Sequence, residues 1–330
     1  HPGQDERNSD GGTMTHIRII LNLSLLALLL ASCAPSVTPV NAPAPTETPA
    51  PEPFRVVAYA TEGIIESLIP YDKLTHINYS FLTPKDDGTF NRISNGWKLK
   101  LIAENAHKQD VKVLISVGGW GWDQQFETVA ADPSLRSAFV QNLKAFVDEY
   151  QLDGADIDWE YPDAGQSAQN FLALMQELRA AMPDKLFTTA VVSHGENGMG
   201  ILPETFELFD FVNVMTYDGP DHGTMEQFER GLAFWSERGL PPEKIVMGLP
   251  FYGDPDLAYY KIVAEDPAAA QSDTFEYFGT TYHYNGIPTV KAKTKTAMEK
   301  AGGIMFWTLD FDAQGEFSLV GAIHETVHSP

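Results

Sequence analysis

Three carboxylic acids alternate with other residues in the segment 153–162, which reads Asp-Gly-Ala-Asp-Ile-Asp-Trp-Glu-Tyr-Pro. Asp156, Asp158 and Glu160 are two residues apart, so on a strand they share one face while Ile157 points to the other. Isolated buried charges are costly, and like charges a few ångströms apart cannot all ionise. We therefore predict that these groups share protons near neutral pH.

A carboxyl group that stays protonated at the end of a strand is the reagent that general acid catalysis requires. Glu160 is outermost in the segment, so we predict that it is the proton donor, with Asp158 as the middle partner and Asp156 as a buried relay. A solvated acidic turn is one alternative, but Ile157 and Trp159 argue against full solvation. A Mg²⁺ or Ca²⁺ site is another, but no EF-hand glycine or further ligand at loop spacing is present. No metal and no organic cofactor are predicted.

Eight short apolar or β-branched runs follow residue 54, and longer amphipathic stretches separate them. The runs lie at residues 55–59, 76–82, 112–117, 154–158, 186–192, 211–215, 245–249 and 303–307. Apolar residues at helical spacing mark, among others, residues 135–150, 225–238, 290–301 and 319–327. This alternation predicts an α/β fold, a (β/α)8 barrel in which the carboxylates lie on the fourth strand. An open doubly wound sheet is the alternative, but no Gly-rich phosphate loop follows the first run.

The longest stretch outside this repeat, residues 255–287, lies between the seventh and eighth predicted strands. Its aromatic residues are Tyr259, Tyr260, Phe275, Tyr277, Phe278, Tyr282 and Tyr284. That content argues against a disordered loop, and we predict a short insertion over the carboxyl-end face, where barrel active sites form. Local packing under a long loop is the alternative for each single tyrosine.

The carboxylate segment has the spacing D-x-x-D-x-D-x-E, and the chain thereby resembles glycoside hydrolase family 18, the chitinase family. Four further segments resemble motifs of that family: Ser-Val-Gly-Gly at 116–119, Met-Thr-Tyr-Asp at 215–218, Gly-Leu-Pro-Phe-Tyr-Gly at 248–253 and Gly-Gly-Ile-Met-Phe-Trp at 302–307. The resemblance covers the whole chain after the linker. It implies one catalytic barrel domain over residues 54–330, which works as a monomer without a cofactor.

The resemblance also implies an activity, the hydrolysis of β-1,4-linked N-acetylglucosamine polymers or oligomers with retained configuration. The family's mechanism is substrate-assisted: the substrate's own acetamide attacks the anomeric carbon, so no second carboxylate is needed at nucleophile distance. By this resemblance Glu160 is the general acid and base, and Asp158 orients the acetamide N–H. Tyr217 would hydrogen-bond the acetamide oxygen, and Asp218 would bind substrate near the scissile bond.

Aromatic residues at the predicted strand ends are expected to contact sugar, because the apolar face of a pyranose packs on an aromatic ring. The resemblance places Trp307 beneath the sugar, and a core tryptophan is the alternative. The other expected groove residues are Tyr59, Phe81, Gly119, Trp120, Trp122 and Met215, with core positions as the alternative for the aromatic ones.

Two places depart from the family's pattern. Asp254 stands where many relatives carry arginine, and the loop 219–223 differs from the common form, so subsite preference is not predicted. The stretch after Gly253 looks shorter than the insertion of deep-cleft exo-acting members. A shallower groove and endo-type cutting are therefore expected.

The amino-terminal region has the pattern of a bacterial lipoprotein signal peptide. Residues 19–30 form a mostly apolar run, too short to span a bilayer comfortably, behind His16 and Arg18. Residues 30–33, Leu-Ala-Ser-Cys, resemble a lipobox, and an ordinary signal peptide with an incidental cysteine is the alternative. We expect Met14 to be the true start, so that residues 1–33 combine a start-site artefact with the signal peptide.

Cys33 is the single cysteine and the expected site of lipidation, which would anchor the protein outside the cytoplasm to the bacterial membrane or cell surface. The proline-rich residues 34–53 would form an extended linker. Contact with the membrane is expected only through this anchor.

The chain has 330 residues, 43% of them hydrophobic, and a formal net charge of −23. That charge repels phosphate backbones and so argues against nucleic-acid partners, whereas a neutral polysaccharide is not repelled. Chitin or its oligosaccharides are the expected partners. The alternatives are an endo-β-N-acetylglucosaminidase acting on N-glycans or peptidoglycan, and a non-catalytic chitin-binding protein, against which the intact Glu160 argues.

Overall fold

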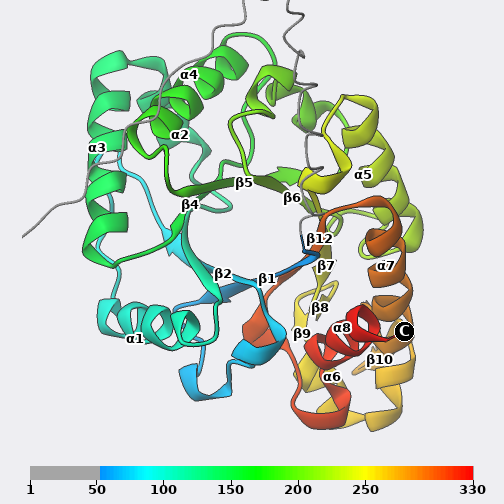
Figure 1. Ribbon diagram of the computed structural model, residues 1–330. Coiled ribbons are helices and arrows are strands. Elements are labelled where there is room, and N and C mark those ends of the chain that lie inside the picture. Colours follow the sequence, from blue (N-terminus) through cyan, green and yellow to red (C-terminus); the bar gives the residue numbers. More distant parts are fainter. Residues whose placement is uncertain (1–52, 330) are drawn as a thin grey trace, which may run out of the picture. The chain divides into compact units, whose positions relative to one another are not determined.

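The computed structural model describes residues 53–329, and their central feature is a closed barrel of eight parallel strands (Figure 1). The strands are β1 (Arg55–Thr61), β2 (His76–Leu82), β3 (Lys112–Gly118), β4 (Gly154–Asp158), β5 (Leu186–Val192), β6 (Phe211–Met215), β7 (Ile245–Pro250) and β12 (Gly303–Trp307). Each strand pairs with the barrel strands before and after it in the chain, and β12 closes the barrel against β1. The predicted (β/α)8 fold is confirmed.

Helices surround the barrel in Figure 1. They are α1 (Gly96–His107), α2 (Asp123–Ala131), α3 (Pro133–Glu149), α4 (Gln166–Ala181), α5 (Met225–Glu237), α7 (Ile287–Lys300) and α8 (Leu319–His328). Helix α3 begins two residues before the predicted boundary, because the Asp132 carboxylate accepts the Ser134 and Leu135 N–H groups and Pro133 suits the first helical turn.

Strand and α-helix do not alternate without exception. The connection from β1 to β2 contains only the 3-10 turns η1 (Glu66–Leu68) and η2 (Tyr71–Lys73). The connection from β5 to β6 contains only η3 (Glu196–Gly200) and η4 (Pro203–Thr205), whereas two helices, α2 and α3, follow β3. The sheet therefore keeps the full eightfold repeat while its helical cover does not.

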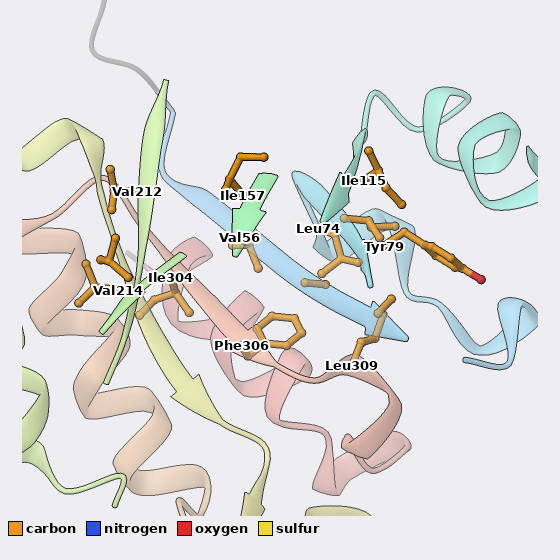
Figure 2. Close-up of a cluster of buried hydrophobic side chains, with 14 of the residues drawn as sticks. Val56, Leu74, Tyr79, Ile115, Ile157, Val212, Val214, Ile304, Phe306 and Leu309 are labelled. Atoms are coloured by element: carbon orange, nitrogen blue, oxygen red, sulfur yellow. The ribbon is translucent and has the colours of Figure 1, made fainter. Parts of the chain in front are cut away.

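Alternate residues of β4 point to opposite sides of the barrel wall, as the sequence predicts. Ala155 and Ile157 belong to the apolar layer between strands and helices, whereas Asp156 and Asp158 are buried on the inner side. Figure 2 shows part of that outer layer, including Val56, Ile157, Ile304 and Phe306. This alternation is what turns two acidic side chains of one strand toward the barrel interior.

The barrel interior has an apolar side and a polar side. The buried apolar residues are Val57, Tyr59, Ala190, Phe211, Met215, Tyr217, Val246, Tyr252 and Met305. The polar side lies on β3, β4 and β5, where Ser116, Asp156 and Thr188 are direct neighbours in the strand register and none is exposed to solvent. A charged group can be buried at Asp156 because hydroxyl groups flank it on both neighbouring strands.

The segment between β7 and α7 folds as an insertion, made of β8 (Tyr252–Gly253), β9 (Leu257–Ala258), α6 (Tyr259–Glu265), η6 (Pro267–Gln271), β10 (Thr274–Tyr277) and β11 (Thr280–His283). Backbone hydrogen bonds between Asp254 and His283 join its two ends. Tyr259 and Tyr284 are buried within the insertion, whereas Phe278, between the paired strands β10 and β11, is 90% exposed. None of the residues 255–287 lines the cavity among the carboxyl ends of the barrel strands, and the expected position of the insertion over the carboxyl-end face stays a prediction.

The described chain enters the barrel at the amino ends of the strands. Pro53 lies in a hollow with residues from the start of several strands, among them Arg55, His76, Lys112 and Phe211. Within residues 53–329 no helix is both long and apolar enough to cross a bilayer. The predicted signal peptide, the lipidation at Cys33 and all of the linker except Pro53 fall outside the described residues.

Candidate active site

A cavity of about 170 Å³ opens among residues at the carboxyl ends of the barrel strands. Its lining residues are Tyr59, Phe81, Trp120, Asp158, Glu160, Ala190, Met215, Tyr217, Asp218, Tyr252 and Trp307. These residues come from strands or loops all around the barrel, and active sites of this fold form at that end. Of the residues in the barrel domain that the sequence analysis expected at the site, Asp156, Gly119 and Trp122 are absent from the lining.

Asp156 lies below the cavity and is fully buried. One carboxylate oxygen accepts the Tyr59 hydroxyl at 2.9 Å and the Ser116 hydroxyl at 2.7 Å. The other accepts the Thr188 hydroxyl at 2.6 Å and the Asn213 amide at 3.2 Å. Burial raises the pKa of Asp156, but these four donors oppose the increase because they stabilise the charged form.

Both carboxylate oxygens of Asp156 accept two hydrogen bonds each, and among the described residues no hydrogen bond joins Asp156 to Asp158. The buried relay therefore stays a prediction, and the geometry itself supports a hydrogen-bonded anchor beneath the site.

Asp158 is 4% exposed, and its Oδ1 atom has no hydrogen-bond partner among the described residues. Burial raises the pKa of Asp158 well above its ordinary value, and the carboxylates of Glu160 and Asp156 add to the increase. A buried oxygen without a partner costs free energy until a donor reaches it. Asp158 thus offers an acceptor to whatever enters the cavity, or holds a proton of its own.

Glu160 follows the end of β4 and is partly buried at the cavity wall. Burial raises its pKa to about 7, and the nearby Asp218 carboxylate contributes to the increase. At neutral pH a substantial fraction of Glu160 is therefore protonated, which suits a general acid. Its neighbour Trp159 points outward, where its ring stacks on Phe126 and its N–H donates to Asp123 at 2.8 Å.

Tyr217 and Asp218 lie in the loop after β6, and both line the cavity. The Tyr217 hydroxyl is buried near the Met305 sulfur, a weak acceptor, at 3.8 Å. Asp218 accepts a hydrogen bond from the Tyr252 hydroxyl and lies 3.7 Å from the His222 ring. Asp218 is exposed, and partial desolvation by its neighbours raises its pKa less than these two contacts lower it, so the pKa of Asp218 is below its ordinary value and the carboxylate is charged at neutral pH.

Aromatic rings form the other wall of the cavity. Trp307 stacks on Phe81, with ring centroids 5.4 Å apart and an interplanar angle of 19°. The Tyr59 ring is tilted against the Trp307 ring, with centroids 5.9 Å apart and an interplanar angle of 56°. Trp307 keeps part of its surface open, whereas the core tryptophans Trp159 and Trp235 are buried. A partly open indole in the same cavity as Asp158 and Glu160 is suited to stacking on a sugar ring.

The protein-family model that describes glycosyl hydrolases family 18 matches residues 55–312. The chain belongs to this family. The resemblance seen in the sequence is thereby confirmed for the catalytic barrel, while the bacterial lipoprotein form stays a prediction.

Solved structures and curated proteins agree with the family. A chitinase from Bacteroides thetaiotaomicron is 31% identical, with a TM-score of 0.76 over 84% of this chain and 97% of its own. The GH18 chitinase ChiB from Flavobacterium johnsoniae is 29% identical, with a TM-score of 0.73 over 84% and 94%. Chitinase 1 of Aphanocladium album is 24% identical over 79% of this chain and 81% of its own.

Several other curated relatives are longer, and the chain covers between 17% and 58% of their length. The two solved structures and the curated protein named above are all chitinases. This family 18 protein is a chitinase-like glycoside hydrolase.

Two expected groove residues of this family 18 hydrolase lie outside the cavity. Gly119 has a φ of +90°, and a Cβ atom there would lie 2.7 Å from the Phe81 ring, so Gly119 makes room for Phe81 and does not line the cavity. Trp122 lies in a separate hollow beside Asp86 and Gln125, directly before α2 begins. Neither residue lines the cavity, and their contact with substrate stays a prediction.

The first aspartate of the family signature, Asp153, lies at the opposite end of the barrel. It accepts the Val113 N–H at 2.8 Å and contacts the His107 ring at 2.7 Å, just before β4 begins. Asp153 therefore ties β3 and α1 to β4 and has no access to the cavity.

Sequence reasoning assigned no role to Tyr252 or Ala190, which line the cavity of this hydrolase. Tyr252 lies within the motif at 248–253, so the motif could have pointed to it, whereas nothing marks Ala190 in the sequence. Among residues 53–329, no group of three or more His, Cys, Asp or Glu side chains is arranged to hold a metal ion.

Proposed function

We propose that this hydrolase cleaves β-1,4-linked N-acetylglucosamine polymers and oligomers with retention, using the substrate's acetamide as the nucleophile. The observation that carries the proposal is the pair Asp158 and Glu160 in one cavity. Asp158 offers a buried acceptor without a partner, and Glu160 has a pKa of about 7. One substrate would satisfy both residues if its N–H group donates to Asp158 and its neighbouring glycosidic oxygen accepts the proton of Glu160.

In the first step, the Glu160 carboxyl group gives its proton to the glycosidic oxygen. The acetamide oxygen of the sugar attacks the anomeric carbon as the bond to the leaving oxygen breaks, which gives an oxazolinium ion. Asp158 accepts the acetamide N–H through Oδ1, which aligns the attack and stabilises the positive charge that develops. The Tyr217 hydroxyl donates to the acetamide oxygen.

In the second step, the Glu160 carboxylate takes a proton from water, which adds to the anomeric carbon from the side that the leaving group vacated. The bond to the acetamide oxygen breaks, and the acetamide is restored. Two inversions give net retention. Trp307, stacked on Phe81, would hold the apolar face of the same sugar ring.

The experiment compares residues 54–330 with Glu160→Gln on N-acetylglucosamine oligomers and follows the anomers of the product by NMR. We expect initial release of β-anomers and a loss of activity in the variant of roughly 10²- to 10⁴-fold. Initial release of α-anomers would contradict the retaining mechanism. Binding without cleavage by both proteins would contradict the activity and direct the search to N-glycans, peptidoglycan or a binding role.

We also propose that the protein is anchored through a lipid on Cys33, outside the cytoplasm. The support is the apolar run at 19–30, which the single cysteine follows three residues later. Expressed from Met14 in a bacterium, the protein should partition into the detergent phase of Triton X-114, and Cys33→Ala should move it to the aqueous phase. Equal partitioning of both would contradict the anchor.

A further inference from the structure

A lysine in the middle of α7 is buried without any exposed surface. The Lys293 ammonium donates to the backbone oxygen of Gly223 at 2.6 Å and to the Asn285 side-chain oxygen at 2.8 Å. It also lies 5.5 Å from the centre of the Phe228 ring. Three parts of the chain that are distant in sequence meet at this one charged group: the loop after β6, the end of the insertion and α7.

The Gly223 oxygen is held from two directions. The Asn285 amide donates to it at 2.7 Å, beside the Lys293 ammonium. Gly223 has a φ of +66°, and a Cβ atom there would lie 3.0 Å from the Asn285 amide nitrogen. The close approach of the loop to Asn285 therefore depends on a glycine at this position.

From Gly223 the contacts continue to the cavity through one buried glutamine. The Gly223 N–H donates to the Gln227 side-chain oxygen at 3.0 Å. The Gln227 amide nitrogen in turn donates to the backbone oxygen of Asp218 at 2.7 Å and to that of Tyr217 at 3.2 Å. Gln227 is 2% exposed, so water does not compete for these bonds.

Burying an ammonium group is costly, and an apolar side chain would fill the same space without that cost. Burial lowers the pKa of Lys293 to about 7, and the Asp273 carboxylate opposes only part of the decrease. The lysine donates two directed hydrogen bonds, one to the Gly223 backbone oxygen and one to the Asn285 side-chain oxygen, which an apolar residue cannot do. Those bonds fix the far end of the loop that begins at Tyr217.

We propose that Lys293 is a positioning residue, which acts through Gly223 and Gln227 to hold Tyr217 and Asp218 in place for substrate. The proposal rests on the proposed function, in which Tyr217 and Asp218 contact the sugar. It assigns a role in substrate recognition to α7 and to the end of the insertion, although neither lines the cavity.

The test is Lys293→Met in the purified protein, with Lys244→Met as the matched control. Lys244 also donates to two backbone oxygens, those of Phe206 at 3.0 Å and Phe209 at 2.7 Å, and lies in the hollow at the amino ends of the strands. Loss of a half-buried lysine there should lower the melting temperature without reaching the cavity. Asn285→Ala is the second variant, in case Lys293→Met does not fold.

Two measurements are made on each variant. Hydrogen–deuterium exchange of peptides within residues 216–228 should speed up in Lys293→Met and, to a lesser degree, in Asn285→Ala, but not in Lys244→Met. For N-acetylglucosamine oligomers, kcat/KM should fall roughly tenfold or more in Lys293→Met, since small misplacements of a binding group are costly. In Lys244→Met it should stay within about twofold of the native value.

Unchanged exchange of residues 216–228 in Lys293→Met and Asn285→Ala would overturn the proposal. So would faster exchange with native kcat/KM, because the loop would then move without consequence for substrate. If the native protein cleaves no such oligomer, the proposed function fails first. The exchange measurement then still decides whether Lys293 holds the loop.

Discussion

Asp156, Asp158 and Glu160 have the same chemistry in solution, and their surroundings separate them in the fold. Asp156 receives four hydrogen bonds, which stabilise its charge, whereas Asp158 is buried with one oxygen unpartnered. Glu160 lies at the cavity wall with a pKa of about 7. Three like residues are thereby suited to the three tasks of the proposed mechanism: support, acceptance of a substrate donor and proton transfer.

The pKa of Glu160 predicts how activity depends on pH. Because the first step needs Glu160 protonated, kcat/KM for an uncharged N-acetylglucosamine oligomer should fall as pH rises through about 7. The measurement is a pH–rate profile at constant ionic strength, read together with circular dichroism to exclude unfolding. A flat profile up to about pH 9 would contradict the assignment of Glu160 as the acid.

The same pKa has a consequence for stability. A carboxyl group whose pKa rises from 4.5 in the unfolded chain to about 7 in the folded protein favours the folded state in its protonated form. That stabilisation is complete below pH 4.5 and is lost as pH rises through about 7. Glu160→Gln, which imitates the protonated form, should therefore raise the melting temperature more at about pH 8.5 than at about pH 4. An equal difference at both pH values would contradict the raised pKa.

Among the elements, the loop after β3 shows how backbone space supports the aromatic wall. Gly119 and Gly121 have nearly the same φ, +90° and +91°, but only Gly119 faces a neighbour, the Phe81 ring, where a Cβ atom would lie 2.7 Å away. Gly121 has nothing within 4 Å. The pair therefore separates the effect of a steric contact from that of backbone strain alone.

Gly119→Ala should displace Phe81 and disturb its stacking on Trp307, and so weaken oligosaccharide binding roughly tenfold. Gly121→Ala should bind like the parent. Tryptophan fluorescence titration in the inactive Glu160→Gln background measures both without interference from cleavage. Equal affinity of the two alanine variants would show that Phe81 does not support the sugar site.

The strands were predictable because most are short apolar or β-branched runs, and the position of Asp158 followed from the two-residue period of β4. The missing helix between β5 and β6 was harder to foresee, although Gly195, Gly200 and Pro203 interrupt any helical pattern there. The roles of Gln227 and Lys293 could not be predicted. Their partners include backbone oxygens, which leave no mark in the sequence.

At the scale of the molecule, the net charge of −23 predicts how ionic strength affects turnover. An uncharged oligomer is neither attracted nor repelled, so its KM should change less than about twofold between about 0.05 M and about 0.5 M salt. A partly deacetylated, cationic oligomer should instead show a KM that rises with salt. A strong salt effect on the uncharged substrate would mean that charge takes part in its binding.

Pro53 and the first residues of the strands lie at one end of the barrel, and Glu160 lies at the other. Any attachment made through the preceding chain, whether a lipid, a resin or a fusion partner, joins the molecule at the end remote from its catalytic mouth. A chain fixed close to Pro53 would therefore leave that mouth free to meet diffusing sugar chains.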